Sequence, residues 1–258
     1  MFINVYIGVN NGFSDKFFTI LKITQPFIEG RLIKRYKRFL ADVQLSDGKI
    51  VTAHTANTGS MQGCSDPGSR VWLYDSKNPK RKYRYSWDLV EDLSGNFVGI
   101  HTTRANRLVH EAIENGVIAE LQNYINIRSE VKYLESNTRF DLLLSKEDHS
   151  EPCFVEVKNV TAKRGTDIAI FPDAKTERGK KHLVTLIDAV QHGFRAVIFF
   201  CIQRSDVNKF KPADEIDPEY GELLRKACAS GVEALAYKAY LSPDEVYLNA
   251  PIPIILNE

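Results

Sequence analysis

The chain has 258 residues, of which 43% are hydrophobic and 26% are charged, and its formal net charge is +1. These values are ordinary for a globular protein of one large or two modest domains. No apolar run approaches the roughly 18–20 residues of a membrane span, and the N-terminus lacks the features of a signal peptide. The four cysteines form no C-x-x-C pair. We therefore expect a cytoplasmic protein with reduced thiols, no zinc and no membrane partner.

The first half of the chain reads as short strands. Residues 1–24 precede the clear patterning, and we expect them to form a peripheral extension. Over residues 25–95, five short apolar segments are separated by turn signals such as Ser46-Asp47-Gly48 and Pro67-Gly68. This spacing favours a small five-stranded barrel of the oligonucleotide-binding (OB) type, although it excludes no other small β-fold.

The predicted barrel is basic. Residues 26–90 contain twelve Lys or Arg and six Asp or Glu, a local charge of +6, so the rest of the chain sums to −5. One predicted strand, "IKRYKRF", concentrates four of these cations: Lys34, Arg35, Lys37 and Arg38. Such side chains neutralise phosphates, which predicts DNA as the partner. The alternative is a solvated basic strand.

A turn-rich segment, "HTANTGSMQGC", follows the third predicted strand. It lacks the Gly-Lys-Ser/Thr of a Walker A loop and the frame of a nucleophile elbow. Asn57 and Ser60 could donate hydrogen bonds to a phosphate, and a purely structural turn is an equally good interpretation.

After Gly99 the pattern changes to alternating helices and strands. "RANRLVHEAIENG" has helical periodicity and ends at Gly116, a predicted C-cap. "RAVIFFCIQR" is apolar throughout, which predicts a strand buried on both faces of an α/β layer. Residues 96–258 are therefore expected to form an α/β domain.

Two neighbouring apolar segments carry unexpected charges. Asp141 opens the first, and Glu156 and Lys158 occupy alternate positions of the second, so both should point to one face. If the strands pair, Asp141 and Glu156 approach closely, and two such carboxylates repel unless a cation lies between them. The pattern predicts a Mg²⁺ or Mn²⁺ site, with Lys158 orienting a water and stabilising charge on a phosphate. The alternative is an ion pair on an edge strand, with Asp141 capping a strand start.

The Glu-Val-Lys tripeptide also occurs at Glu130–Lys132, among polar and turn-like residues. This copy is not expected to carry the chemistry.

The clearest predicted helix begins within "FPDAKTERGKKHL", with Thr176 as its N-cap. Arg178, Lys180, Lys181 and His182 lie in its first turns, where positive charge opposes the helix dipole. We expect them to contact a DNA backbone. The alternative is a surface cluster paired with Asp173 and Glu177, and Asp173 is an outside candidate for the metal site.

The arrangement of two acids and a lysine on paired strands resembles the active site of the PD-(D/E)XK nuclease superfamily. In that superfamily an earlier helix often adds a carboxylate to the site. Glu111 is the first candidate for it here, and Glu130 is the second. Segments such as "AHTANTGSMQGCSDPGSRVWL", "FVEVKNVT" and "FPDAKTERGKKHL" further resemble the sugar fermentation stimulation protein A family of prokaryotes. That resemblance covers residues 26–256 and implies a DNA-binding protein with an OB barrel and a nuclease-like domain.

Together these observations predict a two-domain α+β protein: an extension at 1–24, an OB-like five-stranded β-barrel at 25–95, and a restriction-endonuclease-like α/β domain at 96–258. The predicted function is DNA binding with Mg²⁺- or Mn²⁺-dependent phosphodiester hydrolysis through Asp141, Glu156, Lys158 and Glu111. The alternative is a non-catalytic DNA-binding transcriptional regulator of sugar metabolism on a nuclease scaffold. A third, more remote alternative is an enzyme that acts on a small phosphate compound. The sequence is also compatible with a homo-oligomer.

Overall fold

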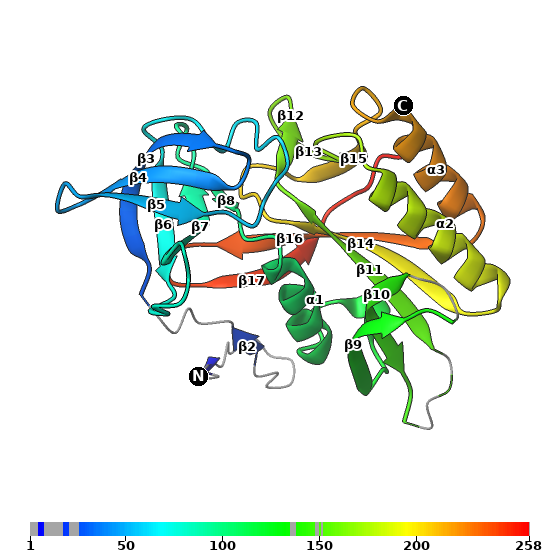
Figure 1. Cartoon of the computed structure of the whole chain (residues 1–258). Coiled ribbons are helices and arrows are strands. Elements are labelled where there is room, and N and C mark those ends of the chain that lie inside the picture. The colour runs from blue at the N-terminus through cyan, green and yellow to red at the C-terminus, as the bar shows by residue number, and fades with distance from the viewer. Residues whose placement is uncertain are drawn as a thin grey trace.

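The computed structural model describes residues 5–7, 18–20, 26–134, 138–147, 150 and 152–257. Of the predicted extension at residues 1–24, it describes one antiparallel pair, β1 (Val5–Ile7) with β2 (Phe18–Ile20). The rest of that prediction lies outside the described residues. Beyond it the chain forms a β-barrel followed by a larger domain with helices on a mixed sheet (Figure 1).

The barrel confirms the predicted OB-like domain. Its strands are β3 (Ile28–Tyr36), β4 (Leu40–Leu45), β5 (Ile50–His54), β6 (Arg70–Asp75) and β7 (Tyr85–Glu91). They are ordered β5-β4-β3-β6-β7, and a parallel pairing of β5 with β7 closes the sheet on itself. A short strand, β8 (Phe97–Gly99), then pairs with β7, so the barrel sheet continues past residue 95.

The basic segment of β3 differs from its predicted alternation. The sequence predicts a strand through Arg38, but β3 ends at Tyr36, which pairs with Leu40 of β4. The chain must reverse between them, and Lys37 and Arg38 do so with φ of 49° and 66°. This left-handed conformation costs a non-glycine residue about 1–2 kcal/mol. The two cations therefore form an exposed turn at the tip of a hairpin.

The C-terminal domain is built on a six-stranded sheet in the order β17-β16-β14-β11-β10-β9. Its strands are β9 (Asn126–Lys132), β10 (Arg139–Ser145), β11 (Cys153–Val160), β14 (Arg195–Ile202), β16 (Glu233–Leu241) and β17 (Val246–Pro251). β11, β14 and β16 run parallel, and the outer pairings are antiparallel. A small sheet of β12 (Ala162–Arg164), β13 (Ile168–Phe171) and β15 (Lys209–Pro212) lies beside it.

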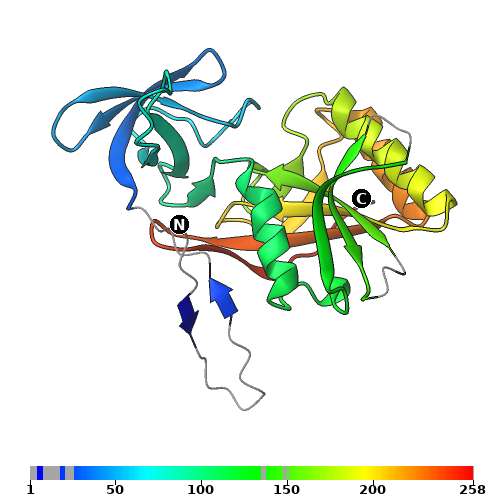
Figure 2. The ribbon, with the colours of Figure 1, turned by 60° about the horizontal axis from the view of Figure 1, so that its bottom comes forward.

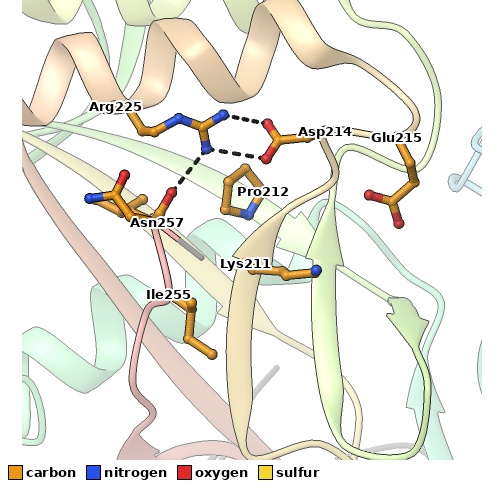
Figure 3. A pocket seen from close by; sticks show the side chains of 8 residues that line it. Lys211, Pro212, Asp214, Glu215, Arg225, Ile255 and Asn257 are labelled. Atoms are coloured by element: carbon orange, nitrogen blue, oxygen red, sulfur yellow. Dashed lines mark hydrogen bonds and ion pairs between the residues drawn. The ribbon is translucent and has the colours of Figure 1, made fainter.

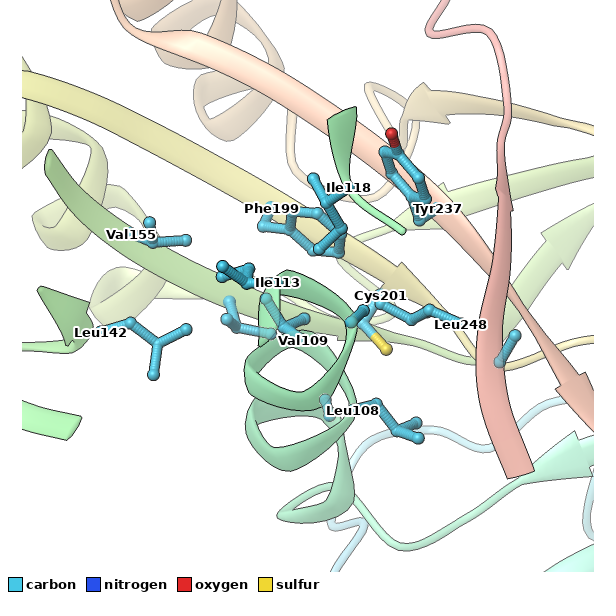
Figure 4. Close-up of a cluster of buried hydrophobic side chains, with 14 of the residues drawn as sticks. Leu108, Val109, Ile113, Ile118, Leu142, Val155, Phe199, Cys201, Tyr237 and Leu248 are labelled. Atoms are coloured by element: carbon cyan, nitrogen blue, oxygen red, sulfur yellow. The ribbon is translucent and has the colours of Figure 1, made fainter. Parts of the chain in front are cut away.

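Helices cover both faces of the central sheet. α1 (Arg104–Glu114) packs on one face, and α2 (Glu177–Gln191) and α3 (Pro218–Ala229) pack on the other (Figures 1 and 2). A short 3₁₀ helix, η1 (Ala119–Leu121), follows α1. Under α1 the core is made by side chains such as Val109, Val155 and Phe199 (Figure 4). β14 is buried along almost its whole length, which confirms the two-sided burial predicted for it.

The predicted start of α2 is also confirmed. Thr176 caps the helix, because its hydroxyl accepts a hydrogen bond from the backbone N–H of Gly179 at 3.0 Å. Past the other end, Gly193 has φ of 81°, the left-handed conformation that ends many helices. These signals fix where α2 begins and ends along the chain.

The barrel and the C-terminal domain share one hydrophobic cluster. Trp72 and Leu89 of the barrel belong to the same buried group as the inner face of α1. Arg204 is fully buried at this junction and donates to the Thr161 carbonyl at 2.9 Å and to Asp206 at 2.8 Å. On the barrel side, Arg204 lies 3.6 Å from the carboxylate of Asp92 and forms an isolated backbone bridge with Val98, so it links the two domains. In the described part of the chain no helix is long and apolar enough to cross a membrane, and the four cysteines are free thiols.

Candidate metal and nucleic-acid site

The sheet splits at the position of the predicted acid pair. The ladder between β10 and β11 ends at Leu142 opposite Val155, while β10 keeps pairing with β9 as far as Arg139. Asp141 and Glu156 each lie one residue beyond that last pair. The sequence pattern thus places two carboxylates where the two strands diverge.

Asp141 is held by two donors. Its Oδ2 accepts a hydrogen bond from the backbone N–H of Val157, and its Oδ1 accepts one from Nδ2 of Asn106 on α1, both at 2.7 Å. Burial, together with the negative charge of Glu156, raises the pKa of Asp141 to about 6. The charged form is therefore costly here unless a cation compensates it.

Glu156 and Lys158 project from β11 to the same face, as the strand alternation predicts. Their side chains are 3% and 10% exposed, and Lys158 Nζ donates to Glu156 Oε1 at 2.6 Å. Burial by itself raises the pKa of Glu156, but the hydrogen bond from His182 and the charge of Lys158 outweigh it and hold that pKa below its usual range. Glu156 is therefore an anion within the sheet.

His182 completes this group, although the sequence predicts it only as a member of the basic cluster at the start of the helix. It comes from α2 and is only 8% exposed. Its Nδ1 contacts Glu156 Oε1 and lies 3.1 Å from Lys158 Nζ, and its Nε2 accepts from Nε of Arg178 at 3.4 Å. One sequence signal points to it: His182 lies four residues before Leu186, on the apolar stripe of the helix. A polar residue on a buried helix face needs a polar partner.

One oxygen of the acid group has no partner. Glu156 Oε2 is buried and makes no hydrogen bond among the described residues, a condition that costs free energy. Together with Asp141 it offers the oxygen ligands that hard divalent cations take. The part of the chain that the structure describes holds no cluster of three or more metal-ligating side chains. Two carboxylates suit Mg²⁺ or Mn²⁺, since such cations keep several waters.

Glu111, the predicted helix carboxylate, does not join this group. Its Oε1 accepts from Nε of Arg107 at 2.7 Å, one turn earlier on α1. Glu111 lies five residues after Asn106, which turns its side chain about 140° around the helix axis. The helix side chain that contacts Asp141 is therefore the amide of Asn106.

The two remaining acidic candidates lie elsewhere. Glu130–Lys132 was expected in a turn-like region, but it belongs to the edge strand β9, where Glu130 is exposed and has φ of 53°. Asp173 points to the barrel instead of the acid pair, because its Oδ2 accepts from the backbone N–H of Ser60 at 2.9 Å.

The predicted phosphate-binding side chains divide into two sets. Six are exposed: Lys34, Lys37, Arg38, Ser60, Arg178 and Lys181. Two are engaged in the fold. Asn57 is 5% exposed, and its side chain accepts from the Gly59 N–H at 2.9 Å and donates to Thr161 at 3.3 Å. Arg35 donates to backbone carbonyls of the loop at residues 57–60. The two sets therefore differ in whether a ligand can reach them.

Arg35→Lys should destabilise the protein by about 2 kcal/mol, because a lysine cannot bridge the several carbonyls that the guanidinium joins. Chemical unfolding would measure this loss. Arg31→Lys on the same strand is the matched control, since Arg31 donates to one carbonyl, that of Gly68, at 2.9 Å. Equal losses in both variants would contradict the structural role of Arg35.

A pocket of about 450 Å³ at the far end of the domain is a separate feature (Figure 3). It lies between the end of β15, α3 and the C-terminal segment. Lys211 and Arg225 both line it, and Arg225 is paired with Asp214 at 2.8 Å and donates to the Leu256 carbonyl at 3.0 Å. None of the candidate site residues lines it.

Comparison with known proteins agrees with the predicted resemblance. The family model described as "SfsA N-terminal OB domain" matches residues 33–100, and "Sugar fermentation stimulation protein RE domain" matches residues 103–245. The "Sugar fermentation stimulation protein homolog" of Geobacter metallireducens is 54% identical over 236 residues, 92% of this chain and 100% of that protein. The homolog of Pelobacter propionicus is 55% identical over 231 residues, 90% of this chain and 98% of that protein.

A solved structure is also similar. The SfsA protein of Pyrococcus furiosus, described in complex with Ca²⁺, superposes with a TM-score of 0.81 at 27% identity and covers 92% of this chain and 98% of its own. Both halves of the chain thus match one family, in the same order and over almost the whole length. The chain belongs to the sugar fermentation stimulation protein family.

Proposed function

We propose that the protein binds DNA and hydrolyses phosphodiester bonds with Mg²⁺ or Mn²⁺ held by Asp141 and Glu156. The observation that carries this proposal is the buried acid pair at the strand fork, in which Glu156 Oε2 has no partner among the described residues. A family member from P. furiosus is described in complex with Ca²⁺, which takes the same kind of oxygen ligands. That likeness supports a divalent cation in this chain.

The side chains around the pair have distinct tasks in this proposal. Asn106 and the Val157 N–H orient Asp141, while His182 keeps Glu156 and Lys158 in position. The ammonium of Lys158 stabilises negative charge that develops on the phosphate. A bound cation would polarise the phosphate and lower the pKa of a water.

The exposed cations would hold the nucleic acid. Arg178 and Lys181 lie at the start of α2, next to the buried His182, and Lys37 and Arg38 form the hairpin turn of the barrel. Backbone phosphates are the ligands that such exposed charges attract without reading the sequence. We expect binding to weaken steeply as the salt concentration rises.

A non-catalytic DNA-binding regulator is the second candidate. One observation favours it: Lys158 Nζ already lies 2.6 Å from Glu156 Oε1, so the buried charges partly neutralise each other within the protein. In that case the same surface would bind DNA, and Glu156 with Lys158 would be a structural ion pair.

Metal-dependent cleavage separates these two candidates. Plasmid and single-stranded DNA would be incubated with the protein in EDTA, Mg²⁺ or Mn²⁺, with binding followed by fluorescence anisotropy at the same time. We expect cleavage with either cation and none in EDTA, while binding persists in EDTA. Binding without cleavage under every cation would favour the regulator.

A further inference from the structure

A second pocket, of about 400 Å³, lies where the barrel meets the C-terminal domain. Both domains contribute to its walls. Its lining includes Thr58, Asn159, Thr161, Phe171, Asp173 and Arg178. Ligand sites form preferentially at such domain junctions, and small-molecule pockets start at about 300 Å³. Its size suits one planar ring system with its sugar and excludes a duplex.

The barrel wall of this pocket is fixed by contacts between the domains. Asn57 donates to Thr161, and Asp173 accepts from the Ser60 N–H. Gly59 passes so close to Asp173 that a Cβ at this position would lie 2.0 Å from Oδ2, so the close approach requires glycine. The wall is therefore preorganised before any ligand arrives.

The polar groups in the pocket are of mixed type. Asn159 Oδ1 accepts from Gln203, which orients the amide, and within the described residues its Nδ2 has no partner. The Thr58 hydroxyl is also without a partner there. Arg178 uses only its Nε, and Asp173 uses only its Oδ2. The pocket thus offers donors on Thr58, Asn159 and Arg178 and acceptors on the Thr58 hydroxyl and the Asp173 carboxylate, with one positive and one negative charge.

This balance distinguishes a nucleobase from a phosphate. A phosphate presents acceptors only and would be repelled by the carboxylate of Asp173. A base edge presents donors and acceptors together, and its ring can contact Phe171 on the pocket wall.

The pocket is connected to the acid pair. Asn159 follows Lys158 on β11, so its side chain leaves the opposite face of the strand, and the connection runs through Arg178. Arg178 contacts His182 Nε2 at 3.4 Å, and His182 Nδ1 lies 3.1 Å from Lys158 Nζ. A nucleotide with its base in the pocket would therefore place a neighbouring phosphate near Arg178, on the side of the strand fork.

We propose that this interdomain pocket binds one unpaired nucleobase of the DNA substrate, next to the phosphodiester that reaches Asp141 and Glu156. The inference rests on the proposed nucleic-acid function. A base inside a duplex cannot enter such a pocket unless it is flipped out. The substrate is therefore single-stranded DNA, or duplex DNA with an unpaired nucleotide.

The test compares an intact single strand of about a dozen nucleotides with an abasic strand of the same length, by fluorescence anisotropy in EDTA. Wild type should bind the intact strand on the order of tenfold more tightly. Thr58→Trp, which fills the pocket from an exposed loop, should remove that difference and leave abasic binding unchanged. Ser94→Trp, in an exposed turn of the barrel outside the pocket, is the matched control and should retain the difference.

Equal affinity of wild type for both strands would overturn the proposal, as would an equal loss for both strands in Thr58→Trp. Glucose binding that Thr58→Trp abolishes would also overturn it, by assigning the pocket to a sugar. Because all binding is measured in EDTA, the outcome does not depend on catalysis. Failure of cleavage with Mg²⁺ or Mn²⁺ would reject the hydrolase and leave the base pocket standing.

Discussion

Asp141→Asn should reduce DNA cleavage on the order of 10³-fold and, at the same time, make the metal-free protein more stable. The loss of activity follows because an amide is a poor ligand for a hard cation and carries no charge to hold it. Both hydrogen bonds can be kept, since the new amide oxygen accepts from the Val157 N–H and Asn106 can turn its amide so that its oxygen accepts from the new NH₂ group. Cleavage rates with Mg²⁺ and chemical unfolding in EDTA measure the two effects.

The gain in stability follows from the pKa of Asp141. Burial and the charge of Glu156 raise that pKa from 3.8 to about 6 in the folded protein, so the folded state binds the proton more tightly than the unfolded state. Stability is therefore lost as the pH rises from about 4 to about 6 and stays lower above it. Two pKa units correspond to about 3 kcal/mol. Asparagine does not titrate, so the variant should be about 2–3 kcal/mol more stable near neutral pH.

Asp47→Asn is the matched control, because Asp47 is an exposed turn residue whose carboxylate accepts from the Lys49 N–H. It should change neither cleavage nor the pH dependence of unfolding. An Asp141→Asn variant that cleaves like wild type would remove this residue from the metal site. A variant that is less stable at neutral pH would show that the carboxylate is compensated within the protein.

The pair of Glu156 and Lys158 should show strong energetic coupling. Lys158→Met leaves a buried carboxylate without its cation, and Glu156→Gln leaves a buried ammonium without its anion, so each should cost about 3 kcal/mol of unfolding free energy. The double variant replaces both charges with groups of similar size and should cost far less than the sum. We expect a coupling energy of at least about 2 kcal/mol from unfolding curves of the four proteins.

Lys209 and Asp167 supply the matched pair for this cycle. Their charged atoms lie 3.5 Å apart, but both side chains are substantially exposed. Lys209→Met combined with Asp167→Asn should show coupling below about 1 kcal/mol. Additive costs at Glu156 and Lys158 would mean that the two charges do not compensate each other inside the sheet.

The acid pair and its lysine could be predicted because strand alternation is a local property. Glu156 and Lys158 are two residues apart, so their common face follows from the backbone alone. Asp141 needed only the assumption that the next strand pairs with them, which the register at Leu142 and Val155 bears out.

His182 and Asn106 could not be assigned in the same way. Each depends on which face of a helix meets the sheet, and on how far along the sheet the helix lies. A pattern of charges at the start of α2 predicts an exposed cluster, yet one of its members turns inward to Glu156. On α1 the prediction of Glu111 rests on the chemistry of a carboxylate and not on its angle around the helix, so it misses Asn106.

The barrel loop shows another limit of prediction. Arg35 and Asn57 are residue types that often bind phosphate. In the structure the loop at residues 57–60 folds over Arg35, and the Asn57 side chain connects this loop to Thr161. That contact spans 104 positions in the sequence, so no local pattern reports it. The turn at Lys37 and Arg38 has neither the glycine nor the asparagine that usually marks such a conformation.

Calorimetric titration of Mn²⁺ into wild type and Asp141→Asn tests most directly whether the strand fork is a cation site. It needs no substrate and does not depend on which bond is cleaved. We expect one Mn²⁺ to bind each wild-type chain through Asp141 and Glu156, and the variant to lose this binding. Equal Mn²⁺ affinity in both proteins, or none in wild type, would contradict the metal site and with it the proposed hydrolysis.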